Sequence, residues 1–242
     1  MRGISPVVFG AALLLATAAG LSTADEPKQW WWGTGGTPAD IGREVLWLDN
    51  PDFGGNASSS EVIGAFDLWT EVATDFLFET DATIRKVTWW GWYWNGFEEP
   101  TGSGFNLRFY HHGTGCLPED APFVEYLLPG NDCCETLANG GDQFSQFVYE
   151  YCLDVQLAPG HYWFSAQMAD HAFPPQWGRL TADRVQVCDS GFRCPFFGWL
   201  DWVPIGSTGI LYPFDFGQMF EDVCAPTAVE TASWGTVKGL YR

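Results

Sequence analysis

The sequence predicts an all-β protein: a single antiparallel β-sandwich of jelly-roll-like architecture, with a short C-terminal helix or tail. Short apolar runs recur along the chain between clusters of Gly, Pro, Asn and Asp, which is typical of antiparallel strands joined by turns. Helical periodicity is scarce before residue 225. The length of 242 residues suits one domain, because all-β single domains commonly reach about 200 to 250 residues.

The composition is that of a folding, strongly acidic chain. It has 11 Lys and Arg against 30 Asp and Glu, which gives a formal net charge of -19. Because 46% of the residues are hydrophobic and 14 are Trp, the chain can build a core, which excludes a disordered polymer. The negative field repels nucleic-acid phosphates, so we expect no nucleic-acid partner.

The start of the chain is typical of an export signal. Arg2 supplies a positive charge, Val7–Leu21 form an apolar stretch, and residues 22–24 are small enough for cleavage after Ala24. The stretch is short for a membrane-spanning helix of about 20 residues. We therefore predict a signal peptide over residues 1–24 and a secreted or cell-surface protein that is not an integral membrane protein.

The remaining chain divides into three parts by composition. Residues 25–44 form an irregular leader rich in Gly, Thr and Pro, residues 45–224 form the sandwich, and residues 225–242 form a tail. Ser233 can cap a short helix in this tail, which then docks on the sandwich. Alternatively, the tail is a sorting signal, because its last twelve residues resemble short endings of exported Gram-negative proteins.

Alternation of side chains along the expected strands predicts which faces are buried. In the segment 144–155, Phe147, Tyr149, Tyr151 and Leu153 share one side, and the opposite side is more polar. We expect the aromatic side to face the core. The expected strands are residues 44–48, 75–78, 83–94, 105–110, 123–127, 144–155, 161–168, 184–187, 196–202 and 214–220.

Seven Cys follow the predicted signal, which favours disulfides formed in an oxidising compartment. We expect a bridge between Cys188 and Cys194, because the polar, Gly-containing loop between them can turn back. Zinc is not expected, because no Cys pair has the C-x2-C spacing. The other pairings stay open among Cys116, Cys133, Cys134, Cys152 and Cys224.

The most distinctive segment is the aromatic run from Trp89 to Trp94. On one strand, Trp90, Trp92 and Trp94 share a face, and Trp89, Gly91 and Tyr93 share the other. One face should enter the core. The other either lies under a covering loop or forms a flat row on which sugar rings stack. The expected ligand-binding residues are Trp90, Trp92, Trp94, Asn95 and Glu98.

Metal ligands are sparse in the sequence. Asp49, Asn50 and Asp52 place oxygen donors in a Gly-containing loop that suits calcium or, without metal, an Asx turn. His111 and His112 are adjacent and diverge on an extended chain, so we expect no zinc or copper site there. Calcium is thus the only cofactor that we consider.

Six short strings follow one another along the chain. They are Leu48-Asp-Asn-Pro, Ala73-Thr-Asp-Phe, Val87-Thr-Trp-Trp-Gly-Trp-Tyr, Phe105-Asn-Leu-Arg-Phe-Tyr, Leu117-Pro and Leu157-Ala-Pro-Gly-His-Tyr-Trp-Phe-Ser. In this order they resemble a family of uncharacterised secreted bacterial β-sandwich modules. The resemblance runs from about Val45 to Val223 and implies a jelly-roll-like sandwich outside the cell. It transfers no catalytic residue, and the family usually has two acids where this chain has Thr74 and Asp75.

These features favour a secreted, non-catalytic module that binds polysaccharide or cell-surface material through the aromatic strand. A carbohydrate-active hydrolase is one alternative, but it needs two carboxylates about 5 to 10 Å apart, and the adjacent Glu98 and Glu99 point to opposite faces of a strand. The G-x-S-x-G motif of a serine hydrolase is absent from the sequence. A structural component of a surface layer or assembly is the other alternative.

Overall fold

The computed structural model describes residues 44–53, 56–64, 67–94, 104–130, 134–139, 146–169, 174–182, 187–209 and 213–224. The predicted signal peptide, the leader up to residue 43 and the tail 225–242 lie outside these residues. Within the described part of the chain, no helix is long and apolar enough to cross a membrane.

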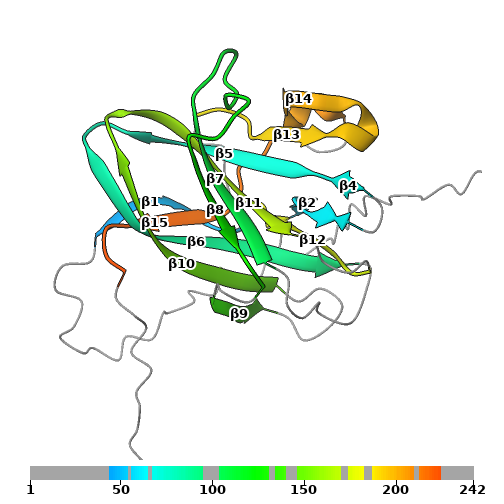
Figure 1. The fold of residues 1–242 in the computed structure, drawn as a ribbon, viewed down its shortest axis with the longest axis horizontal. Coiled ribbons are helices and arrows are strands. Elements are labelled where there is room, and N and C mark those ends of the chain that lie inside the picture. The colour runs from blue at the N-terminus through cyan, green and yellow to red at the C-terminus, as the bar shows by residue number, and fades with distance from the viewer. Residues whose placement is uncertain are drawn as a thin grey trace, which may run out of the picture.

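Two antiparallel sheets make up the fold (Figure 1). The larger has the order β1-β15-β6-β10-β9. Strand β12 also pairs with β6, beyond the segment paired with β15, and β2 pairs with β12. The bounds are β1 (Val45–Asp49), β15 (Gln218–Glu221), β6 (Ala82–Trp94), β10 (Gln146–Leu157), β9 (Cys134–Asn139), β12 (Gln176–Leu180) and β2 (Ala57–Ser59).

The second sheet has the order β14-β13-β5-β11-β7-β8, and a two-stranded sheet pairs β3 with β4. Two short 3-10 helices, η2 (Pro195–Phe197) and η3 (Ile205–Thr208), precede and follow β14. The strand bounds are β14 (Trp199–Pro204), β13 (Gly191–Cys194), β5 (Glu71–Phe78), β11 (Gly160–Ala169), β7 (Gly104–His111), β8 (Val124–Leu128), β3 (Val62–Ile63) and β4 (Leu68–Trp69).

From β5 onward the chain passes back and forth between the two sheets. Strand β5 lies in the second sheet, β6 in the first, β7 in the second, β10 in the first and β11 in the second. Such alternation is typical of double-sheet, jelly-roll-like folds. The predicted all-β sandwich is confirmed.

The core lies between the sheets and is mostly aromatic. On β6, Trp89 and Tyr93 point inward, and on β10 Phe147 and Tyr149 do the same. The Trp89 and Tyr149 rings stack with centroids 5.5 Å apart. The predicted inward face of the 144–155 segment is confirmed, since Leu153 belongs to the same cluster.

Gly91 is the position on β6 where the core leaves no room for a side chain. A Cβ atom there would lie 2.4 Å from the Trp177 indole, which also donates a hydrogen bond to the Tyr149 hydroxyl at 3.0 Å. We expect Gly91→Ala to lower the free energy of unfolding by about 1–3 kcal/mol through overpacking. Urea unfolding measures this. The control Arg85→Ala removes only an exposed ion pair on the same strand and should change stability by less than about 1 kcal/mol.

Several expected strand boundaries are wrong. Residues 214–220 were expected as one strand, but β15 begins only at Gln218, and β5 begins at Glu71 and not at Asp75. Residues 196–202 were expected as one strand, but Pro195 begins η2, so the run is a 3-10 turn followed by β14. Val187 lies outside any strand, and residues 184–186 lie outside the described part. Strands β2, β3, β4, β9, β12 and β13 were not expected. The Ala-Ser-Ser sequence of β2 has no apolar alternation, and its placement comes from pairing with β12.

Candidate functional site

The tryptophan strand does not form the open row expected for sugar binding. Trp90 is only 3% exposed and packs in a cluster with Val148 and Leu180, against which Phe53 also lies. The Phe53 carbonyl accepts a hydrogen bond from the Gln146 side chain at 3.0 Å, which holds this covering segment in place. The prediction of Trp90 as a ligand-binding residue is therefore wrong, because the outer face of β6 is covered at this position.

Trp92 is half-buried and packs against the same cluster. The side chain of Trp94, and all of Asn95 and Glu98, lie outside the described residues. The sequence left two possibilities for the outer face of this strand, a covering loop or an open row for sugar rings. At Trp90 and Trp92 the structure shows the covered arrangement.

The segment expected to bind calcium is the one that covers Trp90. Asp49 is fully buried, and its carboxylate accepts a hydrogen bond from the Trp47 indole at 2.7 Å. It also lies near Arg179, whose pKa is lowered to about 9 by burial, an effect that Asp49 partly offsets. Asn50 is exposed and Asp52 half-buried. Asp49 is therefore buried near the positively charged Arg179 side chain. It does not lie in an open loop, where calcium binding was predicted.

The predicted Cys188–Cys194 disulfide is wrong. Cys188 is bonded to Cys116, and Cys194 is a free, buried thiol. Cys194 packs on β13 among apolar side chains, whereas Cys188 lies before the strand, beside the turn that follows β7. A second disulfide joins Cys152 to Cys224. The side chains of Cys133 and Cys134 lie outside the described residues.

The largest exposed apolar side chains that lie close together in the sequence are at the tip of the β13–β14 hairpin. Phe196 is 52% exposed, Phe197 37% and Leu200 68%. The Phe196 and Phe197 rings contact each other edge to face, and Phe197 contacts the half-buried Trp199. The Pro-Phe-Phe-Gly-Trp-Leu run carries this signal in the sequence, although its apolar pattern predicts a strand.

The base of the hairpin is firmly anchored. Figure 1 shows it at the edge of the second sheet, where β13 pairs with β5. Phe192 and Ile205 are buried against Val72 of β5, and the Trp199 ring packs on Phe192. Gly198, at φ 86, ends η2 in the left-handed conformation that glycine adopts most easily. The tip is therefore an apolar surface on a rigid support.

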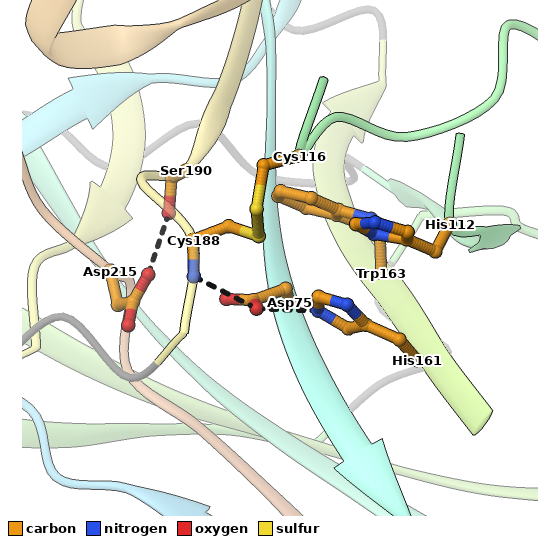
Figure 2. The surroundings of a disulfide bond; sticks show 8 residues. All are labelled: Asp75, His112, Cys116, His161, Trp163, Cys188, Ser190 and Asp215. Atoms are coloured by element: carbon orange, nitrogen blue, oxygen red, sulfur yellow. Dashed lines mark hydrogen bonds and ion pairs between the residues drawn. A yellow bond between two sulfur atoms is a disulfide. The ribbon is translucent and has the colours of Figure 1, made fainter. Parts of the chain in front are cut away.

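A second cluster surrounds the Cys116–Cys188 disulfide (Figure 2). The rings of His112 and His161 stack with centroids 4.0 Å apart, and the Trp163 indole donates to His112 Nδ1 at 3.3 Å. Burial and the neighbouring His161 lower the pKa of His112, which favours a neutral imidazole. Sequence reasoning missed this cluster because His112 meets a histidine of another strand and not its neighbour His111.

Asp75 of β5 holds this cluster from inside the sheet. Its Oδ2 atom lies 2.6 Å from His161 Nε2 and accepts a hydrogen bond from the Cys188 backbone nitrogen at 3.1 Å. Among the described residues, its other oxygen, Oδ1, is buried with no hydrogen-bond partner. Burial raises the pKa of Asp75, and the contact with His161 partly offsets this. The carboxylate fixes the orientation of the His161 ring.

No protein-family model, curated protein or solved structure matches this chain.

Proposed function

We propose that the protein is an exported binding module that attaches to neutral polysaccharide outside the cell through the tip of the β13–β14 hairpin. The observation that carries this proposal is the exposure of Phe196 and Phe197 on the anchored turn and of Leu200 at the start of β14. Two disulfides support the export part of the proposal, because such bonds persist in oxidising compartments.

Exposed apolar side chains of this size call for a partner. Single exposed apolar residues are common on protein surfaces, but contiguous ones mark binding sites. A rigid support lowers the entropy lost on binding, because the rings are already held by Trp199 and Phe192. The tip is therefore better suited to binding than the covered tryptophan strand.

The charge and chemistry of the tip favour a neutral polysaccharide. A net charge of -19 repels polyanionic glycans and anionic lipid surfaces. The aromatic faces of Phe196 and Phe197 can pack against the C–H faces of sugar rings. The neighbouring Asp201 is exposed, and its carboxylate can accept hydrogen bonds from sugar hydroxyls.

A pull-down on insoluble neutral polysaccharides, such as cellulose, chitin and starch, with and without calcium, tests the proposal. The triple variant Phe196→Ala, Phe197→Ala, Leu200→Ala should bind about 100-fold more weakly than the unaltered chain, because anchors of this kind dominate interface energy. The control Leu127→Ala removes a side chain that is 65% exposed on β8 and should bind normally.

Three other results would contradict the proposal. If the triple variant bound polysaccharide as tightly as the unaltered chain, the binding site would not be the hairpin tip. Release of reducing sugars would favour the hydrolase. Self-association that the triple variant abolishes, with no polysaccharide bound by the unaltered chain, would favour the structural component of an assembly.

A further inference from the structure

Four potential metal ligands from separate parts of the chain meet beside β5. His112 follows β7, His161 begins β11, and Cys188 precedes β13. One ligand atom from each of these three residues lies within 4.8 Å of the others. Cys116, in the turn after β7, brings a fourth, because its sulfur is bonded to that of Cys188.

We propose that reduction of the Cys116–Cys188 disulfide turns this cluster into a zinc site with two thiolate and two imidazole ligands. The disulfide takes up two electrons and two protons from a dithiol reductant, which is itself oxidised to a disulfide. Zinc then displaces both thiol protons when it binds. Cys116 is exposed in its turn, so a reductant can reach the bond from that side.

The ligand set and its spacing suit zinc. Two Cys and two His are a common tetrahedral set for this ion, with bonds of about 2.0–2.3 Å, so the ligand atoms of such a site lie about 3.3–3.8 Å apart. The ligand atoms of His112, His161 and Cys188 lie within 4.8 Å of one another, so small shifts would bring them to the separations of a zinc site. Local spacing offers only His112 and Cys116, which are four residues apart. The sequence alone could not predict the site, because His161 and Cys188 join this pair from distant parts of the chain.

Asp75 supplies the independent observation that points to a cation. A carboxylate that accepts a hydrogen bond from a ligand histidine is a recurrent feature of zinc sites, since it fixes the ring and strengthens the ligand. Asp75 stands in this relation to His161 at 2.6 Å. Its buried Oδ1 atom, which has no hydrogen-bond partner among the described residues, leaves negative charge that a bound cation would offset.

The oxidised chain, in which the Cys116–Cys188 disulfide is intact, is not expected to bind zinc tightly. Both sulfurs are used in the covalent bond, and the stacked imidazole planes of His112 and His161 lie only 18° apart, so their lone pairs do not converge on one point. Reduction frees two thiolates and lets the rings turn. Binding should therefore depend on the redox state of this one bond.

Cobalt(II) is a suitable probe, because a tetrahedral thiolate site gives it intense visible absorption. The whole chain is reduced anaerobically with a phosphine in a background of Cys133→Ser, Cys134→Ser, Cys152→Ser and Cys224→Ser, so that these four thiols do not contribute. We expect one tetrahedral cobalt per reduced chain, displaced by zinc, and none in the oxidised chain. Asp75→Asn should weaken zinc binding about 10–100-fold.

Ligand variants and a matched control decide the assignment. His112→Ala, His161→Ala and Cys188→Ser should each abolish the tetrahedral spectrum. His111→Ala should keep it, because that neighbouring ring stacks on Phe123. A spectrum that survives loss of both ligand histidines, or one that is equal in the oxidised chain, would overturn the proposal.

If the serine background does not fold, zinc X-ray absorption on the otherwise unaltered reduced chain gives the answer. Two sulfur and two nitrogen neighbours are expected, and the nitrogen neighbours should be lost in the His112→Ala, His161→Ala double variant. A shell of sulfur alone, or no bound zinc, would contradict the site.

Discussion

Replacing Glu71 by Ala is expected to lower the free energy of unfolding by about 3–5 kcal/mol at neutral pH, the range typical of breaking a buried charge cluster. Glu71 opens β5 and is 1% exposed. Its Oε2 atom accepts a hydrogen bond from Arg193 Nε at 2.9 Å, and its Oε1 accepts one from the Tyr110 hydroxyl at 2.7 Å. Arg108 lies 3.2 Å from Oε1. Without the carboxylate, both guanidinium groups lose their buried partner.

This contribution should depend on pH in a defined direction. Burial alone would raise the pKa of Glu71, but Arg193 and Arg108, aided by the Tyr110 hydroxyl, lower it below its ordinary value. A carboxyl group with a lowered pKa in the folded state stabilises the fold above its ordinary pKa. That stability is lost as the pH falls toward the lowered value.

Urea unfolding of the unaltered chain, of Glu71→Ala and of Glu71→Gln at neutral and acid pH measures both effects. Gln keeps the shape and loses the charge, so the difference in stability should shrink as Glu71 becomes protonated in acid. A difference below about 1 kcal/mol at neutral pH, or one that does not change with pH, would show that the ion cluster does not stabilise the fold.

Removing the Cys152–Cys224 disulfide by the double change to Ser is expected to lower the free energy of unfolding by about 4 kcal/mol. The bond closes a loop with a sequence separation of 72, and its Cα atoms lie 5.6 Å apart, within the normal range for a disulfide. It ties β10 to the segment after β15, the strand between β1 and β6. Without this bond the unfolded chain gains conformational entropy, which lowers the stability of the folded state.

Guanidinium unfolding of the oxidised proteins measures this loss, and thiol labelling verifies which bonds are formed. Cys194→Ala is the control, because it removes a cysteine sulfur but no cross-link, and it should lower stability by only about 1 kcal/mol. A double variant as unstable as this control, and no more so, would mean that the bond does not restrain the unfolded chain.

Much of the fold could be predicted from local pattern. The 83–94 and 144–155 segments became β6 and β10 within a few residues, because long alternating strands with aromatic side chains on one side specify both the strand and its buried face. Strand β2 could not be predicted, since Ala57–Ser59 has no apolar signal and pairs only because β12 lies beside it.

The candidate sites divide in the same way. The apolar run at Phe196 was visible in the sequence, but its exposure depends on Pro195, which turns the chain where a strand was expected. The aromatic strand was visible too, but burial of Trp90 depends on the distant segment around Phe53. Local sequence does not reveal which loop crosses which face.

The sequence by itself determined that this chain is a β-sandwich rich in buried aromatic rings, because the period of two and the turn residues act over neighbouring positions. Only the tertiary structure decided which cysteines pair and which histidines meet. Cys116 and Cys188 have a sequence separation of 72, and His112 meets His161 across adjacent strands β7 and β11. Such contacts arise from the order of strands in the sheets, which no local periodicity encodes.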